Sequence, residues 1–143
     1  MKSCYWLLTV LLLVCCTWGT ANGEDDRVRV IVDADTANEI DDLYAIVRAM
    51  VAPEFQVEGL TSAHYTRSTE PNETVHRSQE LNEQLLDAMG LRNSIPHPVG
   101  GDRSMPNTTT AVDSPAARLI IERAHAGGPN DKLIVFALGA CTN

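Results

Sequence analysis

The chain has 143 residues and a formal net charge of −8, because 19 Asp and Glu residues outnumber 11 Lys and Arg residues. Binding to nucleic acid or to an anionic membrane surface needs clustered Lys and Arg, so the acidic balance argues against both partners. The length suits one domain of ordinary size.

The N-terminal 23 residues follow the plan of a secretory signal peptide: Lys2, an apolar stretch over residues 5–16, and small or polar residues ending at Gly23. The stretch is too short for a membrane-spanning helix, which needs about 20 residues. We therefore predict a signal peptide over residues 1–23, a secreted or periplasmic protein without membrane attachment after cleavage, and one domain over residues 24–143. An uncleaved anchor is the alternative. Of the four cysteines only Cys141 would remain, so a hydrophobic core rather than an internal disulfide must stabilise the fold.

Strand and helix patterns alternate along the first half of this domain. Residues 28–32 are rich in valine and isoleucine and predict a strand, residues 41–52 predict a helix that Pro53 ends, and residues 55–62 predict a second strand. Residues 78–89 predict a second helix, with Leu81, Leu85 and Met89 on its apolar face. A short extended piece over residues 95–99 and a loop rich in Gly, Pro and Asn over residues 100–112 follow.

The last third predicts a capped helix and a strand. Ser114 is the expected N-cap, with Pro115 at the first helical position. Residues 132–138 then form a nearly continuous apolar run, which is typical of a strand buried on both faces of a parallel sheet. The order of elements predicts an α/β fold with a doubly wound, mainly parallel, Rossmann-like sheet. Because the chain stops one loop after a strand, we expect it to be the N-terminal part of a larger domain.

The stretch DADTANEIDD, residues 33–42, places five carboxylates directly after the first strand. Ligands of parallel sheets bind at the carboxyl ends of the strands, so Asp33, Asp35, Asp41 and Asp42 can surround one point on that edge. Ca²⁺ accepts six to eight oxygen ligands and would relieve the repulsion between them. The loop over residues 139–143 follows the last strand, and it can add a backbone carbonyl if the two strands are neighbours.

The acidic stretch has three other interpretations. A solvated turn that caps the following helix is the simplest. An EF-hand is excluded, because Ala37, Asn38 and Tyr44 stand where that loop needs an oxygen ligand, Gly and Glu. A phosphotransferase that uses an aspartyl phosphate would also place Asp-x-Asp after a first strand, but it would leave Asp41 and Asp42 without a role.

Three segments together resemble a known family. VIVDADTANEIDDLYAIVRAM, VEGLTSAHY and LIVFALGACTN are similar, in order and spacing, to the N-terminal half of the inosine-uridine-preferring nucleoside hydrolases. The usual signature of that family is Asp-x-Asp-Pro-Gly-x-Asp-Asp; this chain has two additional residues and lacks Pro and Gly. It looks like a divergent branch with the pattern D-x-D-x-x-N-E-I-D-D, which also tends to carry DSPAARLIIERA before the last strand. The resemblance covers residues 28–143.

The resemblance implies a role for individual residues. Asp35 would bind Ca²⁺ and act as general base toward a water molecule, and Asp42 would be a bidentate calcium ligand. Asp41 would hold a ribose hydroxyl, and Thr142 would offer its backbone carbonyl to the metal. His64 is a candidate for the pocket wall, because family members place pocket residues in the loop after the second strand.

The function that the resemblance implies is calcium-dependent hydrolysis of the N-glycosidic bond of ribonucleosides to a base and ribose. Asp33 would support the loop. The remaining ligands and the acid for the leaving base would come from the family's C-terminal half. The expected partner is a small-molecule nucleoside or a related N-glycoside, and a homo-oligomer is left open. The alternatives are a non-catalytic ligand-binding module of the same fold and an Asp-based phosphotransferase or phosphatase.

Overall fold

The computed structural model of the chain describes residues 26–66 and 71–143. The predicted signal peptide, residues 1–23, lies outside the described residues. In the part that is described, no helix combines the length and the apolar character that crossing a membrane would need.

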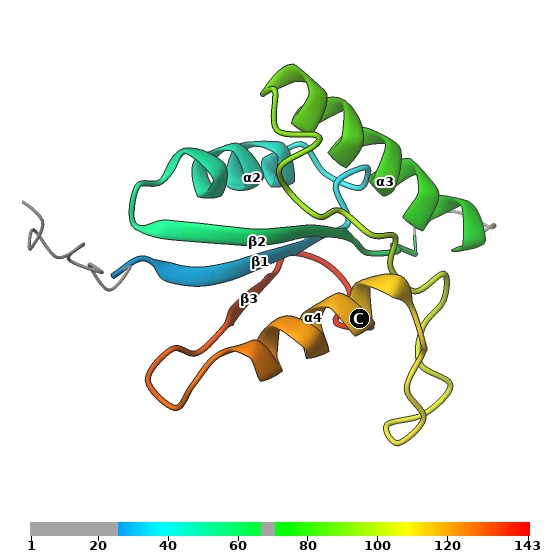
Figure 1. Ribbon diagram of the computed structural model, residues 1–143. Coiled ribbons are helices and arrows are strands. Elements are labelled where there is room, and N and C mark those ends of the chain that lie inside the picture. The colour runs from blue at the N-terminus through cyan, green and yellow to red at the C-terminus, as the bar shows by residue number, and fades with distance from the viewer. Residues whose placement is uncertain (1–25, 67–70) are drawn as a thin grey trace, which may run out of the picture.

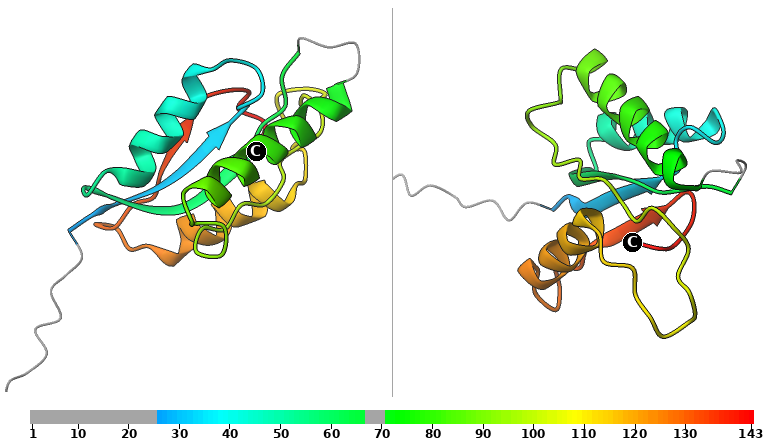
Figure 2. Two further views of the ribbon diagram at one scale, coloured as in Figure 1. Left: turned by 90° about the horizontal axis from the view of Figure 1, so that it is seen from above. Right: turned by 90° about the vertical axis from the view of Figure 1, so that its right-hand side faces the viewer.

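Three parallel strands form one sheet between two layers of helices. The elements follow one another as β1 (Val28–Ala34), α2 (Asp41–Val51), β2 (Phe55–Ser62), α3 (Pro71–Ala88), α4 (Pro115–Ala126) and β3 (Ile134–Ala137). The strand order is β2-β1-β3, with β1 paired in parallel to both neighbours. Helices α2 and α3 lie on one face of the sheet and α4 lies on the other (Figures 1 and 2). The predicted Rossmann-like α/β fold is therefore confirmed.

The core lies between β1, β2 and the two helices on their shared face. Its fully or nearly buried side chains are Val32, Ala34, Ile46, Ala49, Leu60 and Leu86. Phe55 and Phe136 extend this cluster with an edge-to-face contact, their ring centroids 5.4 Å apart. On the other face, Gly59 lets α4 approach β2 closely, because a Cβ there would lie 2.9 Å from Cδ2 of Leu119.

A buried ion pair joins the sheet to the end of α4. The register between β1 and β2 shifts after Val30, and this irregularity leaves Glu58 without a partner position on β1. Arg29 donates two hydrogen bonds to the Glu58 carboxylate, at 2.6 and 2.9 Å. Its Nη2 also donates to the carbonyl of Arg123 at 2.8 Å, near the end of α4. Arg29 thus links two strands and a helix through one guanidinium group.

Helix α3 differs from its prediction. It begins at Pro71 rather than at residue 78, and it ends at Ala88. Leu81, Leu85 and Met89, which were expected on the buried face, are only half-buried. The fully buried positions are instead Thr74, Val75, Ser78, Asn82 and Leu86. The face is partly polar because it covers the loop after β1, whose backbone groups need hydrogen-bond partners.

Strand β3 is also different from the prediction of a strand buried on both faces. It is shorter, and Ile134 and Val135 remain 44% and 38% exposed. The apolar run was assigned to the sheet interior, but within the described chain β3 is the edge strand beside β1. Cys141 is exposed in the loop that follows β3.

Candidate functional site

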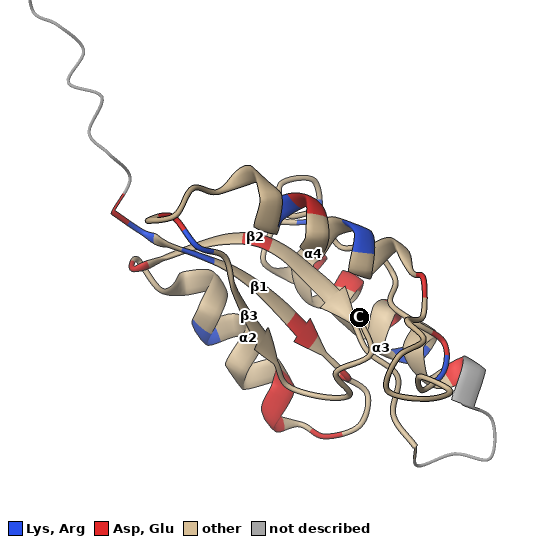
Figure 3. Ribbon diagram, turned by 90° about the horizontal axis from the view of Figure 1, so that it is seen from below, with Lys and Arg blue, Asp and Glu red and all other residues tan. Residues whose placement is uncertain are grey.

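The acidic loop after β1 meets the loop after β3 at the carboxyl edge of the sheet. The Leu138 backbone N–H donates to the Asp33 carbonyl at 2.8 Å. Gly139 lies against Asp35 so closely that a Cβ on Gly139 would be 2.6 Å from the Asp35 Cγ. Figure 3 shows the acidic ribbon segments gathering at the end of β1 and the start of α2. The expectation that these two loops meet is therefore confirmed.

Asp35 and Asp42 form a pair of buried carboxyl groups at this edge. Their side chains are brought together because Asp35 follows β1 and Asp42 lies in the first turn of α2; the residues are 7% and 6% exposed. The pKa of Asp42 is raised from its ordinary 3.8 to about 7; burial is the largest cause, and a hydrogen bond to the Asp35 carboxyl and the negative charge of Asp35 act in the same direction. Within residues 26–66 and 71–143, the Asp42 Oδ2 atom is buried and has no hydrogen-bond partner. A buried carboxyl oxygen without a partner is costly unless another group completes it.

This pair fits a divalent cation better than it fits a solvated turn. Two carboxylates that converge in a buried place and leave one oxygen unpartnered offer the hard oxygen donors that Ca²⁺ binds. Among residues 26–66 and 71–143, no three His, Cys, Asp or Glu side chains group into a metal site. Further protein ligands from this part of the chain would therefore be backbone carbonyls or neutral side-chain oxygens.

Asp33 is held differently from Asp35 and Asp42. It is 3% exposed, and its Oδ1 accepts hydrogen bonds from the Thr61 hydroxyl at 2.7 Å and the Asn143 amide at 2.9 Å. Burial raises the pKa of Asp33, and these two hydrogen bonds partly oppose that effect. Asp33 thus connects β1, β2 and the loop after β3 through buried hydrogen bonds.

The other predicted site residues, Asp41, Thr142 and His64, lie at the same edge of the sheet in different surroundings. Asp41 is exposed in the first turn of α2. Thr142 is half-buried and precedes Asn143, whose side chain contacts Asp33. His64 is 3% exposed; its Nε2 lies 3.2 Å from the Ser104 hydroxyl, whereas its buried Nδ1 has no hydrogen-bond partner in the described part of the chain. His64 therefore lies under the loop over residues 100–112, and Asp41 faces solvent.

Several residues that support the acidic loop were not recognised in the sequence. Thr36 donates to the Asn82 Oδ1 at 2.5 Å, and the Asn82 amide reaches the Thr61 carbonyl at 3.4 Å. The Ala37 backbone N–H donates to the Ser78 hydroxyl at 3.4 Å. The signal was available, because Thr74, Ser78 and Asn82 repeat at intervals of four along the helix, which places them on one face.

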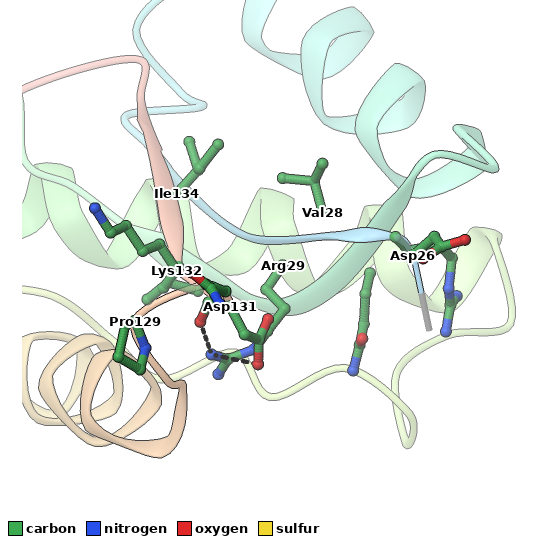
Figure 4. Close-up of a pocket in the computed structure, with 11 residues that line it drawn as sticks. Asp26, Val28, Arg29, Pro129, Asp131, Lys132 and Ile134 are labelled. Carbon is green, nitrogen blue, oxygen red and sulfur yellow. Dashed lines mark hydrogen bonds and ion pairs between the residues drawn. The ribbon is translucent and has the colours of Figure 1, made fainter. Parts of the chain in front are cut away.

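A cavity of about 820 Å³ lies at the opposite, amino-terminal edge of the sheet, and its lining includes Arg29, Asp131 and Lys132 (Figure 4). Arg29 is paired with Glu58 and with Asp131, so its charge is already neutralised by protein groups. Ligands of parallel α/β sheets bind at the carboxyl edge, where the loops converge. We therefore place the candidate site at Asp35 and Asp42 rather than in this cavity.

Comparison with known proteins adds no assignment. No protein-family model matches the chain, and no curated protein sequence matches it.

Proposed function

We propose that the protein hydrolyses the N-glycosidic bond of a ribonucleoside or a related N-glycoside, with Ca²⁺ bound at the Asp35 and Asp42 carboxylates. The observation that carries this proposal is the buried carboxyl pair at the carboxyl edge of a parallel sheet, where the Asp42 Oδ2 has no hydrogen-bond partner among the described residues. The resemblance of the acidic loop to the nucleoside hydrolase signature supplies the reaction class.

The chemistry suits carboxylates at this place. Cleavage of an N-glycosidic bond passes through a sugar with oxocarbenium character, which negative charge stabilises and which an activated water molecule must attack. When bound, Ca²⁺ would orient that water and lower its pKa. Asp35 is the candidate general base, since a carboxylate within hydrogen-bond reach of the water can remove its proton. Asp41 is exposed beside this pair and can accept a hydrogen bond from a ribose hydroxyl.

The aspartyl-phosphate alternative is less well supported. Its nucleophile would be Asp33, the first Asp after β1. That carboxylate is 3% exposed, and one of its oxygens already accepts two hydrogen bonds. A nucleophile must reach an incoming phosphoryl group, so Asp33 suits an anchor better than a phosphate acceptor.

The test is release of free base from inosine and uridine by the full-length protein, since the resemblance implies further ligands and the leaving-group acid from the family's C-terminal half; it is followed with and without a calcium chelator. We expect turnover that depends on calcium and a loss of at least about 100-fold in kcat for Asp35→Asn, which keeps the shape but removes the base. A non-catalytic binding module would bind calcium and nucleoside in calorimetry yet release no base. Equal turnover by the wild type and Asp35→Asn would contradict the proposed role of Asp35.

A further inference from the structure

The side chain of Asn143 joins four segments at the carboxyl edge. Its Nδ2 donates to the Asp33 Oδ1 at 2.9 Å and to the Ser62 carbonyl at 3.0 Å. Its Oδ1 accepts from the Gly101 backbone N–H at 2.7 Å and from the Ser114 hydroxyl at 3.0 Å. The four partners belong to the end of β1, the end of β2, the start of the loop over residues 100–112, and the N-cap of α4.

Only an amide satisfies these partners. The Ser62 carbonyl can only accept and the Gly101 N–H can only donate, so the group at residue 143 must donate on one side and accept on the other. An amide offers two N–H donors and two acceptor lone pairs, and all are used here. A carboxylate of the same shape would place a negative oxygen against Asp33 and the Ser62 carbonyl. A hydroxyl would be too short and would carry one donor.

Asn143 connects the two loops that carry or touch the candidate metal ligands. Asp33 precedes Asp35 by two residues, and the loop that ends at Asn143 contains Gly139, which packs on Asp35, and Thr142. The Asn143 amide therefore fixes the position of the loop after β3 relative to the acidic loop. Residues that hold metal ligands in place typically change metal affinity by 10- to 100-fold when they are replaced.

We infer that Asn143 is a positioning residue that holds the loop after β3 against Asp33 and thereby sets the calcium affinity of the Asp35–Asp42 pair. The inference rests on the proposed function, since it assumes a calcium site at that pair. Neither the sequence pattern nor the resemblance assigned Asn143 this role.

The test compares calcium binding by calorimetry in the wild type, Asn143→Asp and Asn130→Asp. The control makes the same chemical change at an exposed residue in the turn before β3, at the opposite edge of the sheet. We expect Asn143→Asp to weaken calcium binding by about 10- to 100-fold and Asn130→Asp to change it by less than about threefold. Circular dichroism tests whether each variant is folded.

A double variant separates positioning from general damage. Asp33→Asn combined with Asn143→Asp restores a donor and an acceptor between residues 33 and 143, although the Ser62 carbonyl still faces a carboxylate oxygen, so we expect it to recover part of the lost calcium affinity. If Asn143→Asp is folded and binds calcium as tightly as the wild type does, the inference about Asn143 is wrong, but the proposed calcium site stands. If the wild type binds no calcium, the proposed metal site fails with it. Failure of both Asn143→Asp and the double variant to fold would overturn positioning in favour of a purely structural role.

Discussion

Replacing Asp42 with Asn should stabilise the calcium-free protein at neutral and alkaline pH. The pKa of Asp42 is raised from 3.8 to about 7, so the folded protein binds this proton more tightly than the unfolded chain does. The contribution of Asp42 to stability is therefore greatest below about pH 4 and is lost as the pH rises through 7. The Asn variant stays neutral at every pH, so it avoids this loss.

The size of the effect follows from the pKa. A rise from 3.8 to about 7 corresponds to about 4 kcal/mol. Solvent at the edge of the sheet screens part of the interaction, so we expect Asp42→Asn to gain roughly 2 kcal/mol in free energy of unfolding at pH 8. Near pH 4 the two proteins should be about equally stable, because Asp42 is then protonated in the folded state.

The assay is urea unfolding followed by circular dichroism, in chelator, between pH 4 and pH 8.5. The neighbouring Asp41→Asn is the matched control: its side chain is exposed, so its free energy of unfolding should stay within about 0.5 kcal/mol of the wild type. Adding calcium at about 100 times its Kd should reverse the order, since it stabilises the wild type by about 2.7 kcal/mol but not Asp42→Asn. A difference between wild type and Asp42→Asn that does not vary with pH would refute the reasoning.

Two further predictions concern packing and the buried ion pair. Gly100→Ala should lower the free energy of unfolding in urea by at least about 2 kcal/mol, because its Cβ would lie 1.9 Å from the Ser62 carbonyl oxygen. Gly128→Ala is the control: no atom of the described residues lies within 4 Å of the new Cβ, so the free energy of unfolding should change by less than about 0.5 kcal/mol. Arg29→Met should lower the free energy of unfolding by about 3 to 5 kcal/mol, because it leaves the Glu58 carboxylate buried and unpaired. The double variant with Glu58→Leu should recover much of this loss. Equal costs for the single and double variants would show that the unpaired charge is not the cause.

Local patterns in the sequence were sufficient for most of the elements. Strand β2 has the predicted bounds, Phe55–Ser62, and the Ser114 hydroxyl accepts from the Ala117 backbone N–H as an N-cap does. These features depend on residues that are close together in the chain. The parallel sheet followed from the alternation of strands and helices, since helical crossovers join parallel strands.

Two misassignments have the same physical origin. The buried face of α3 was assigned to leucines, and β3 was assigned to the sheet interior, because apolar residues were taken to mark burial. Burial depends on what lies opposite a side chain. Helix α3 faces the polar groups of the loop after β1, and β3 lies at the edge of the described sheet.

The acidic loop and the loop after β3 could be named as candidates from the sequence, since both follow strands of a parallel sheet. Only the tertiary structure decided which groups meet there. Asp35 and Asp42 come together because a strand end and a helix start converge, whereas Asp41, one residue away, faces solvent. Asn143 contacts Asp33 although 110 positions separate them. Such contacts depend on which strands are neighbours and in what register, and short-range spacing along the chain carries neither.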